Sequence, residues 1–259
     1  MKNRMKWMVT MLLLFAAATT LTAKEGKTYV VSVGINKYAD KGMIELKLSV
    51  KDARTITSIY KSAGNAEVLL LTDNQATKAN IVSSMKQLFK KAQKDDTIIF
   101  FFSGHGSTGN LCAYDKNLMF KDIILAMKRC DAGRKIMYLD ACFTGSMRRE
   151  TRRRHQNSVD WTAEELAERT RKADVMLFLS SLDNESSLEL GNAQNGLFTT
   201  YLREALTGAA DKNNDRVVTA KELFDYVTPK VENASGNRQH PAMWCRFSDN
   251  MPVISLRKQ

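Results

Sequence analysis

Apolar runs and amphipathic stretches alternate along the chain from about residue 27 onward. Short runs rich in β-branched and aromatic residues predict buried strands, and apolar residues at helical spacing predict helices between them. Five strands are expected at residues 29–35, 67–71, 97–102, 134–141 and 174–179. A sixth strand is expected at residues 252–256, with Pro252 in the first position, where a missing N–H is tolerated.

The alternation of strands and helices predicts an α/β fold with a mainly parallel sheet of about six strands and helices on both faces. The strand runs are continuously apolar, which fits strands that are covered on both sides. A helix from about Val50 should end at Gly64, and Thr77 should cap the next helix. In sheets of this kind the functional site lies beyond the carboxyl ends of the strands.

The first 23 residues have the pattern of a secretory signal peptide. Lys2, Arg4 and Lys6 form a basic start, residues 8–21 are apolar or small, and Ala23 offers a cleavage point. A membrane anchor is the alternative, but the apolar stretch of about 14 residues is short of the roughly 20 that a span needs. We therefore expect an exported protein, periplasmic or secreted, with no stable membrane insertion, in which residues 24–259 form one domain.

A glycine-rich loop follows the third predicted strand. It has glycines at 104, 106 and 109, which form a GxGxxG pattern around His105. A dinucleotide site would require a helix to begin there, whereas residues 110–115 look extended. The other interpretation is that the glycines let the backbone turn sharply and leave His105 exposed at the edge of the sheet, where an imidazole can carry protons near neutral pH.

A cysteine stands at the corresponding end of the fourth strand. If the strand persists that far, Asp140 and Cys142 point to the same side because side chains alternate along a strand. In adjacent parallel strands, His105 and Cys142 would occupy neighbouring exits from the sheet. A thiol nucleophile with a histidine base requires such an arrangement.

These loops resemble the caspase-like cysteine peptidases, above all the metacaspases and their bacterial relatives. The resemblance rests on Ser103-Gly-His-Gly106 and on Asp140-Ala-Cys-Phe-Thr-Gly145. Val33-Gly-Ile-Asn-Lys-Tyr38 and Lys51-Asp-Ala53 reinforce it, and it covers roughly residues 27–256. The resemblance implies a caspase-like three-layer sandwich and a cysteine endopeptidase.

The resemblance also implies roles for individual residues. Cys142 is similar to the family's nucleophile and His105 to its general acid/base, while the backbone N–H groups of Gly106 and Cys142 would form the oxyanion hole. Asp52 and Asp140 match acidic positions of metacaspases. Two carboxylates at one pocket favour a guanidinium or ammonium group, so we expect cleavage of peptides or proteins after Arg or Lys. The alternative for Asp52 is a favourable place in the first turn of a helix.

An arginine run lies in the polar stretch 145–160, a possible processing linker. A peptidase that prefers basic residues could cut itself there, and the alternative is a solvated charged loop. The candidate cleavage residues are Arg148, Arg149, Arg152, Arg153 and Arg154. Nucleic-acid binding is not expected, since no aromatic residues are interleaved with the arginines.

A second polar segment resembles a calcium loop. Its candidate ligands are Asp211, Asn213, Asp215, Thr219 and Glu222. Arg216 occupies the sixth position of the loop, where calcium loops usually have glycine. The spacing of Thr219 and Glu222 is also typical of a capping box at the start of a helix. Calcium is therefore a possible ligand, and no cofactor is expected to be required. Cys112 and Cys130 are candidates for a disulfide bond in an oxidising compartment.

The net charge of +11 initially suggests an anionic partner. Three of these charges lie in the predicted signal peptide and a net four in residues 148–154, which leaves +4 for the rest of the chain. The favoured function is thus a Cys142/His105 peptidase. The alternatives are a catalytically silent caspase-like binding or regulatory module and, less favoured, a nucleotide-dependent oxidoreductase.

Overall fold

A computed structural model describes residues 26–107, 109–142, 162–182, 193–245 and 250–257. The predicted signal peptide and the arginine-rich segment lie outside these ranges, so export and the processing linker stay predictions. Among the helices that the structure does describe, none is both long and apolar enough to cross a membrane.

The main sheet confirms the predicted fold class. Its six-stranded path runs in the order β2-β1-β3-β6-β7-β9, and all neighbours are parallel except β7 and β9. A hairpin of two short strands, β4 and β5, continues from the end of β3. The bounds are β1 Thr28–Gly34, β2 Ala66–Thr72, β3 Thr97–Ser107, β4 Asn110–Cys112, β5 Asn117–Met119, β6 Arg134–Cys142, β7 Met176–Leu179 and β9 Ala242–Trp244.

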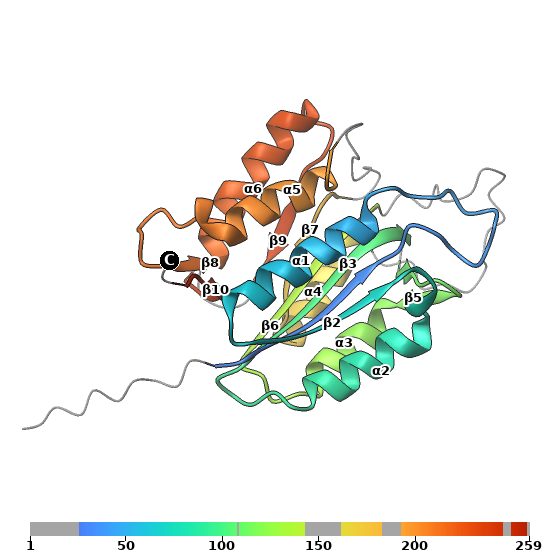
Figure 1. The fold of residues 1–259 in the computed structure, drawn as a ribbon, viewed down its shortest axis with the longest axis horizontal. Coiled ribbons are helices and arrows are strands. Elements are labelled where there is room, and N and C mark those ends of the chain that lie inside the picture. The colour runs from blue at the N-terminus through green and yellow to red at the C-terminus, as the bar shows by residue number, and fades with distance from the viewer. Residues whose placement is uncertain (1–25, 108, 143–161, 183–192, 246–249, 258–259) are drawn as a thin grey trace, which may run out of the picture.

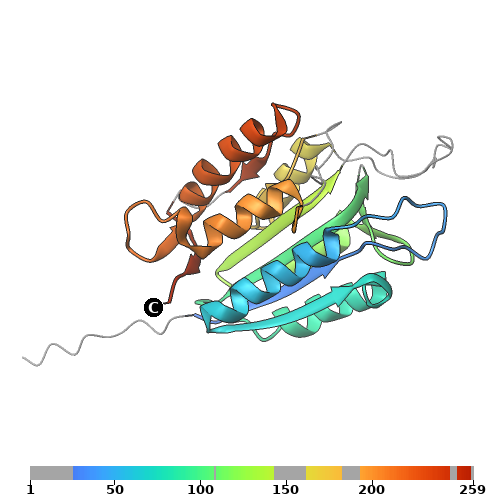
Figure 2. The same ribbon diagram turned by 45° about the horizontal axis from the view of Figure 1, so that its top comes forward.

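Helices cover both faces of this sheet, as the two views show (Figures 1 and 2). One layer holds α1 (Ser49–Ala63), α5 (Leu197–Glu204) and α6 (Ala220–Ser235), and the other holds α2 (Lys78–Phe89), α3 (Phe120–Lys128) and α4 (Ala163–Lys172). Two short helical turns, η1 (Asp73–Gln75) and η2 (Ala205–Ala209), complete the set.

Two apolar cores result, one on each side of the sheet. In β3, Phe100 and Phe102 pack toward α2 and α3, whereas Ile99 and Phe101 pack toward α1, α5 and α6. All four side chains are fully buried. Because side chains alternate along a strand, a strand covered on both faces needs the continuous apolar run that the sequence has.

The helix boundaries follow local chemistry. Helix α1 gives way to Gly64, whose φ of 106° is a conformation that glycine adopts without strain. At the start of α2, the Thr77 side chain accepts a hydrogen bond from the N–H of Asn80, as predicted. Both ends therefore stand where the sequence places them.

The last predicted strand exists but lies elsewhere. β10 (Pro252–Ser255) pairs antiparallel with β8 (Val217–Thr219) in a separate two-stranded sheet. The sixth strand of the main sheet is instead β9, which pairs antiparallel with β7. It is only three residues long and half-buried, so its sequence has too little periodicity to be recognised as a strand.

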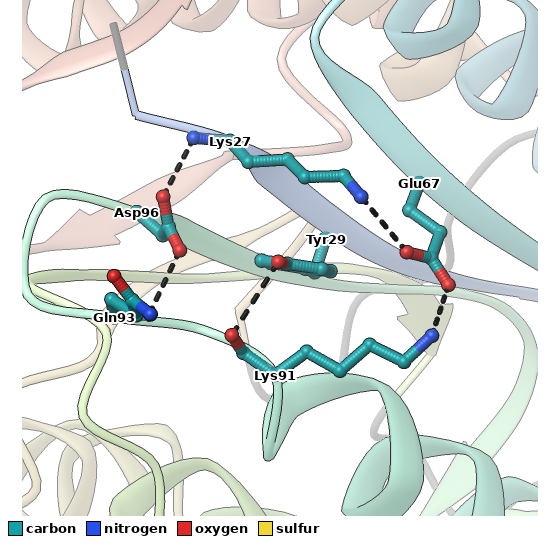
Figure 3. A network of polar contacts seen from close by, with 6 residues as sticks. All are labelled: Lys27, Tyr29, Glu67, Lys91, Gln93 and Asp96. Atoms are coloured by element: carbon teal, nitrogen blue, oxygen red, sulfur yellow. Dashed lines mark hydrogen bonds and ion pairs between the residues drawn. The ribbon is translucent and has the colours of Figure 1, made fainter. Parts of the chain in front are cut away.

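A polar network holds the amino ends of β1 and β3 together, whereas His105 and Cys142 lie at the carboxyl end of the sheet (Figure 3). The Asp96 carboxylate accepts hydrogen bonds from the main-chain N–H of Lys27 (2.7 Å) and of Gln93 (2.8 Å). Glu67 accepts from the ammonium groups of Lys27 and Lys91. Exposed pairs of this kind contribute little energy each. They nevertheless support the register in which Thr28 lies beside Thr97.

Candidate active site

The structure places His105 and Cys142 on neighbouring strands at the same end of the sheet. β3 and β6 run parallel, and His105 is the direct register partner of Cys142 at the last pair of the ladder. Strand β6 extends through Cys142, two residues beyond Asp140. The backbone therefore brings together the two residues that the sequence predicts as the catalytic dyad.

A main-chain carbonyl orients the His105 ring. Its Nε2 lies 2.7 Å from the carbonyl oxygen of Ile44. A carbonyl can only accept a hydrogen bond, so Nε2 carries the proton and donates it to Ile44. The lone pair of the neutral ring is then on Nδ1, and this nitrogen is the one that can accept a proton from a thiol.

Tyr38 supports His105 in two ways. Its hydroxyl accepts a hydrogen bond of 2.7 Å from the His105 main-chain N–H, and its ring packs beside the imidazole with 5.2 Å between centroids. Burial raises the pKa of Tyr38 well above its usual value, so the hydroxyl stays protonated. A Cβ on Gly104 would lie 2.9 Å from the Tyr38 hydroxyl, which explains a glycine there.

The loop between β1 and α1 supplies both Tyr38 and Ile44, and polar contacts fix it near both ends. Asp73 accepts hydrogen bonds from the main-chain N–H groups of Asn36 (2.8 Å) and of the next residue (3.1 Å). The side-chain oxygen of Asn36 accepts a hydrogen bond from the N–H of Val50 (3.0 Å). The main-chain carbonyl of Asn36 accepts one from the N–H of Leu46. These contacts hold the Ile44 carbonyl where the His105 ring can reach it.

Asp52 and Asp140 form a buried acidic pair next to this dyad. Asp52 lies in the first turn of α1 and Asp140 in β6, and their exposed fractions are 2% and 5%. The position that a Cβ would take on Gly196 is 3.3 Å from Asp52 Oδ2 and 3.2 Å from Asp140 Oδ2. The two carboxyl groups, 88 positions apart in the sequence, thus face the same small space.

Several donors hold the acidic pair. Asp52 accepts from Ser103 Oγ (2.9 Å), from Asn195 Nδ2 (2.9 Å) and from the N–H of Gly196 (3.0 Å). Asp140 accepts from Thr199 Oγ1 at 2.7 Å. Of these donors, only Ser103 belongs to a motif that is recognisable in the sequence, namely Ser103-Gly-His-Gly106.

Burial, and secondarily the negative charge of Asp140, raises the pKa of Asp52 to about 7. Hydrogen bonds from Asn195, Ser103 and Gly196 act in the opposite direction, but less strongly. Ionising a buried carboxyl group without a partner costs free energy, and a cation that binds beside the carboxylate offsets this cost. The acidic pair is therefore suited to bind a positively charged group.

The glycine-rich loop does not form a dinucleotide site. β3 continues through Ser107 and returns antiparallel as β4 from Asn110, so a hairpin stands where a helix would have to begin. This finding excludes the dinucleotide interpretation. Gly106 lies next to His105, where β3 changes partner from β6 to β4. Its predicted share in an oxyanion hole, with the N–H of Cys142, stays a prediction.

The possible calcium loop is stabilised by its own backbone. Asp211 accepts from the N–H of Arg216 (3.0 Å), Asp215 from that of Val217 (2.8 Å), and Glu222 from that of Thr219 (3.0 Å). The last contact belongs to a capping box at the start of α6. No cluster of three or more potential metal ligands occurs within the described ranges. Calcium binding by Asp211, Asn213, Asp215, Thr219 and Glu222 stays a prediction, which calorimetric titration can test.

Cys112, Cys130 and Cys245 form no disulfide bond within the described residues. Burial raises the pKa of Cys112 to about 12, so this thiol is inert at neutral pH. Cys130 is also buried and donates a hydrogen bond to the carbonyl of Met127 at 3.1 Å. The possible pairing of Cys112 with Cys130 is absent here.

Curated proteins similar to this chain are metacaspases. Metacaspase-1A of Aspergillus clavatus is 37% identical over 90 residues, a match that covers 31% of this chain and 20% of the relative. Metacaspase-1 of Mycosarcoma maydis is 26% identical over 120 residues, covering 43% and 29%. The matches thus span less than a third of these relatives' lengths.

Among solved structures, protein GSU0716 from Geobacter sulfurreducens shares the fold. The TM-score is 0.61, with 16% sequence identity and coverage of 89% of this chain and 100% of that one. The caspase domain family matches residues 27–252, which include both members of the predicted dyad and both members of the acidic pair. This match spans nearly all of the described structure, and the chain therefore belongs to the caspase domain family.

Proposed function

We propose that this chain is a cysteine endopeptidase that cleaves proteins after Arg or Lys with Cys142 as nucleophile and His105 as general acid/base. The observation that carries the proposal is the register of β3 and β6, which sets these two residues side by side at the carboxyl end of the sheet. When a nucleophile and a base lie on adjacent, rigid strands, the distance between the two residues and their relative orientation are fixed.

The orientation of His105 supports a stepwise mechanism. Nδ1 accepts the thiol proton, and the sulfur attacks the peptide carbonyl carbon. The imidazolium then returns the proton to the leaving amine as the C–N bond breaks. Water hydrolyses the resulting thioester, which releases the acid and restores the thiol. The Ile44 carbonyl keeps its hydrogen bond with Nε2–H and stabilises the charged ring between these steps.

The acidic pair supports the specificity. A guanidinium can bind two carboxylates through several N–H groups, and an ammonium through its three N–H groups. An acidic substrate side chain would add a further negative charge to a buried acidic site, which is strongly unfavourable. Asp52 and Asp140 thus select basic residues and reject acidic ones.

The same preference makes self-processing in the arginine-rich segment part of the proposal. Arg148, Arg149, Arg152, Arg153 and Arg154 offer five bonds of the predicted type a few residues after the nucleophile. This support comes from the sequence alone. Export, proposed from the basic and apolar pattern of residues 1–23, would place the substrates outside the cytoplasm.

A set of fluorogenic peptides that end in Arg, Lys or Asp tests the specificity. We expect hydrolysis of the Arg and Lys peptides and none of the Asp peptide. The measurement is kcat/KM for each peptide, with and without added calcium. A protein that cleaves only the Asp peptide would contradict the assignment of the acidic pair. No cleavage of any peptide or of a denatured protein substrate would favour the alternative, a catalytically silent binding or regulatory module.

A further inference from the structure

Helix α5 begins at the acidic pair. Gly196 is its N-cap residue, and Leu197–Glu204 form the helix. The segment is more than 50 residues beyond Asp140 in the sequence, and none of its residues belongs to the dyad loops. Residues 195–199, at the start of this helix, nevertheless supply three of the four donors described above for the two carboxyl groups, so we consider what these donors do.

Two side chains of this segment are buried and form hydrogen bonds at the site. Thr199, 0% exposed, donates to Asp140 at 2.7 Å. Asn195, 3% exposed, donates to Asp52 at 2.9 Å and to Thr55 Oγ1 at 3.0 Å, which ties it to α1. Hydrogen bonds to a buried carboxylate are strong and directional, so they fix where each oxygen points.

The residue between them has no side chain. A Cβ on Gly196 would lie 3.2 Å and 3.3 Å from one oxygen of each carboxyl group, closer than such contacts usually are. The backbone of Gly196 has φ −54° and ψ 154°, which any residue can adopt. Conformation therefore does not require glycine here, and the absence of a Cβ instead leaves space between the two carboxyl groups.

We propose that residues 195–199, which form the start of α5 and the two positions before it, determine the specificity of the acidic pair, with Gly196 leaving room for the substrate cation and with Asn195 and Thr199 as positioning residues for Asp52 and Asp140. This inference rests on the proposed function. It assigns to three residues at the start of α5 a task that the acidic residues cannot perform alone, namely to set the distance between their oxygens and the direction in which these point.

The geometry explains why both parts are needed. A cation that bridges two carboxylates must approach one oxygen of each within about 3 Å. The space beside Gly196 meets this requirement for Asp52 Oδ2 and Asp140 Oδ2. Rotation of either carboxyl group would move its oxygen away, and the donors on Asn195 and Thr199 oppose this rotation.

Thr199→Val removes the hydroxyl and keeps the side-chain volume. We expect KM for an Arg peptide to rise and kcat/KM to fall by about 10- to 100-fold, the range for a lost hydrogen bond to a charged group. Thr199→Ser should restore most of the activity because it returns the donor. Thr207→Val is the matched control, since Thr207 is exposed and its hydroxyl donates to the main-chain carbonyls of Arg203 and Glu204 at the other end of α5.

Gly196→Ala tests the space directly. A methyl group there should lower kcat/KM for Arg and Lys peptides by about 10-fold or more. The rate at which iodoacetamide, a small neutral reagent, alkylates Cys142 should stay the same, because the dyad is not altered. Thermal midpoints, measured for all variants, separate a lost pocket from a lost fold.

The outcomes distinguish this inference from the proposed function. An active wild-type enzyme whose Thr199→Val and Gly196→Ala variants keep its KM and its preference for Arg would overturn only the inference. Equal losses in Thr199→Val and Thr199→Ser would also overturn it, since the hydroxyl would then be irrelevant. A folded wild-type protein without any peptidase activity would overturn the proposed function and this inference with it.

Discussion

Replacing Cys142 by alanine should abolish hydrolysis of an Arg-terminated peptide, with a loss in kcat of about 10⁴-fold or more. The expectation follows from the mechanism, because without the sulfur no thioester can form and water must attack the peptide bond directly. The measurement is the initial rate with the fluorogenic Arg peptide at saturating concentration. Cys245→Ala is the matched control, since it removes another cysteine of the chain, one that follows β9 and lies outside the predicted dyad.

His105→Gln provides the second half of this test. A glutamine can still donate to the Ile44 carbonyl, but its amide cannot take up the thiol proton. We expect kcat to fall by about 10²- to 10⁴-fold, the usual contribution of a general acid/base, while KM changes little. A His105→Gln enzyme with wild-type kcat would refute the role of the imidazole.

The Cys142→Ala variant also reports on self-processing. If the enzyme cuts itself after the arginines, the active protein should run as two fragments on a denaturing gel and the variant as one chain. N-terminal sequencing of the fragments would then identify a cut after one of the five arginines. Identical single bands for the two proteins, despite full activity of the wild type, would show that processing is not part of the function.

The strands of the main sheet were largely predictable because of how they are buried. Strands β1, β3 and β6 are covered on both faces, so their sequences contain nearly continuous apolar runs with clear ends. β9 has three half-buried residues, and neither its length nor its pattern distinguishes it from a loop. The place of β10 depends on its partner β8, which no local pattern reveals.

The candidate site divides in a similar way. Four predicted site residues have reactive or charged side chains, namely His105, Cys142, Asp52 and Asp140. All but Asp52 lie at strand ends that the sequence locates. Ile44 contacts His105 through its main-chain carbonyl, which every residue type has, so the sequence cannot indicate this contact. Thr199 stands among apolar residues of an amphipathic helix and gives no signal of a polar contact. Such roles depend on tertiary packing.

Asp52→Asn should impair catalysis and at the same time stabilise the protein. The substitution is nearly neutral in shape. Its amide oxygen can accept from Asn195 and Gly196 as before, and its amide NH₂ can donate to Ser103 once that hydroxyl turns its proton away. What changes is the charge that a substrate cation would meet.

The catalytic effect should be large and selective. Removing one partner of a buried ion pair costs about 3–5 kcal/mol, so kcat/KM for Arg and Lys peptides should fall by about two to four orders of magnitude. Alkylation of Cys142 by iodoacetamide should be unaffected. Asp225→Asn is the control, because Asp225 is a partly exposed acid paired with Lys221 on α6 and far in sequence from the acidic pair. An unchanged kcat/KM in Asp52→Asn would remove Asp52 from the substrate site.

The stability effect has the opposite sign, and its pH dependence identifies the cause. The folded protein holds the pKa of Asp52 at about 7, above the value of 3.8 that is usual for an unperturbed aspartate carboxyl group. Between these values the folded state binds a proton that the unfolded state has lost, so wild-type stability falls as the pH rises through 7. Asp52→Asn lacks this loss, and its advantage in thermal midpoint should widen from pH 5 to pH 8 and then level off. A constant difference across this range would mean that Asp52 is already ionised in the folded protein at pH 5. A group that destabilises the empty enzyme near pH 8 and yet is needed for turnover is kept for its ligand, since a structural acid would be expected to stabilise the fold at the same pH.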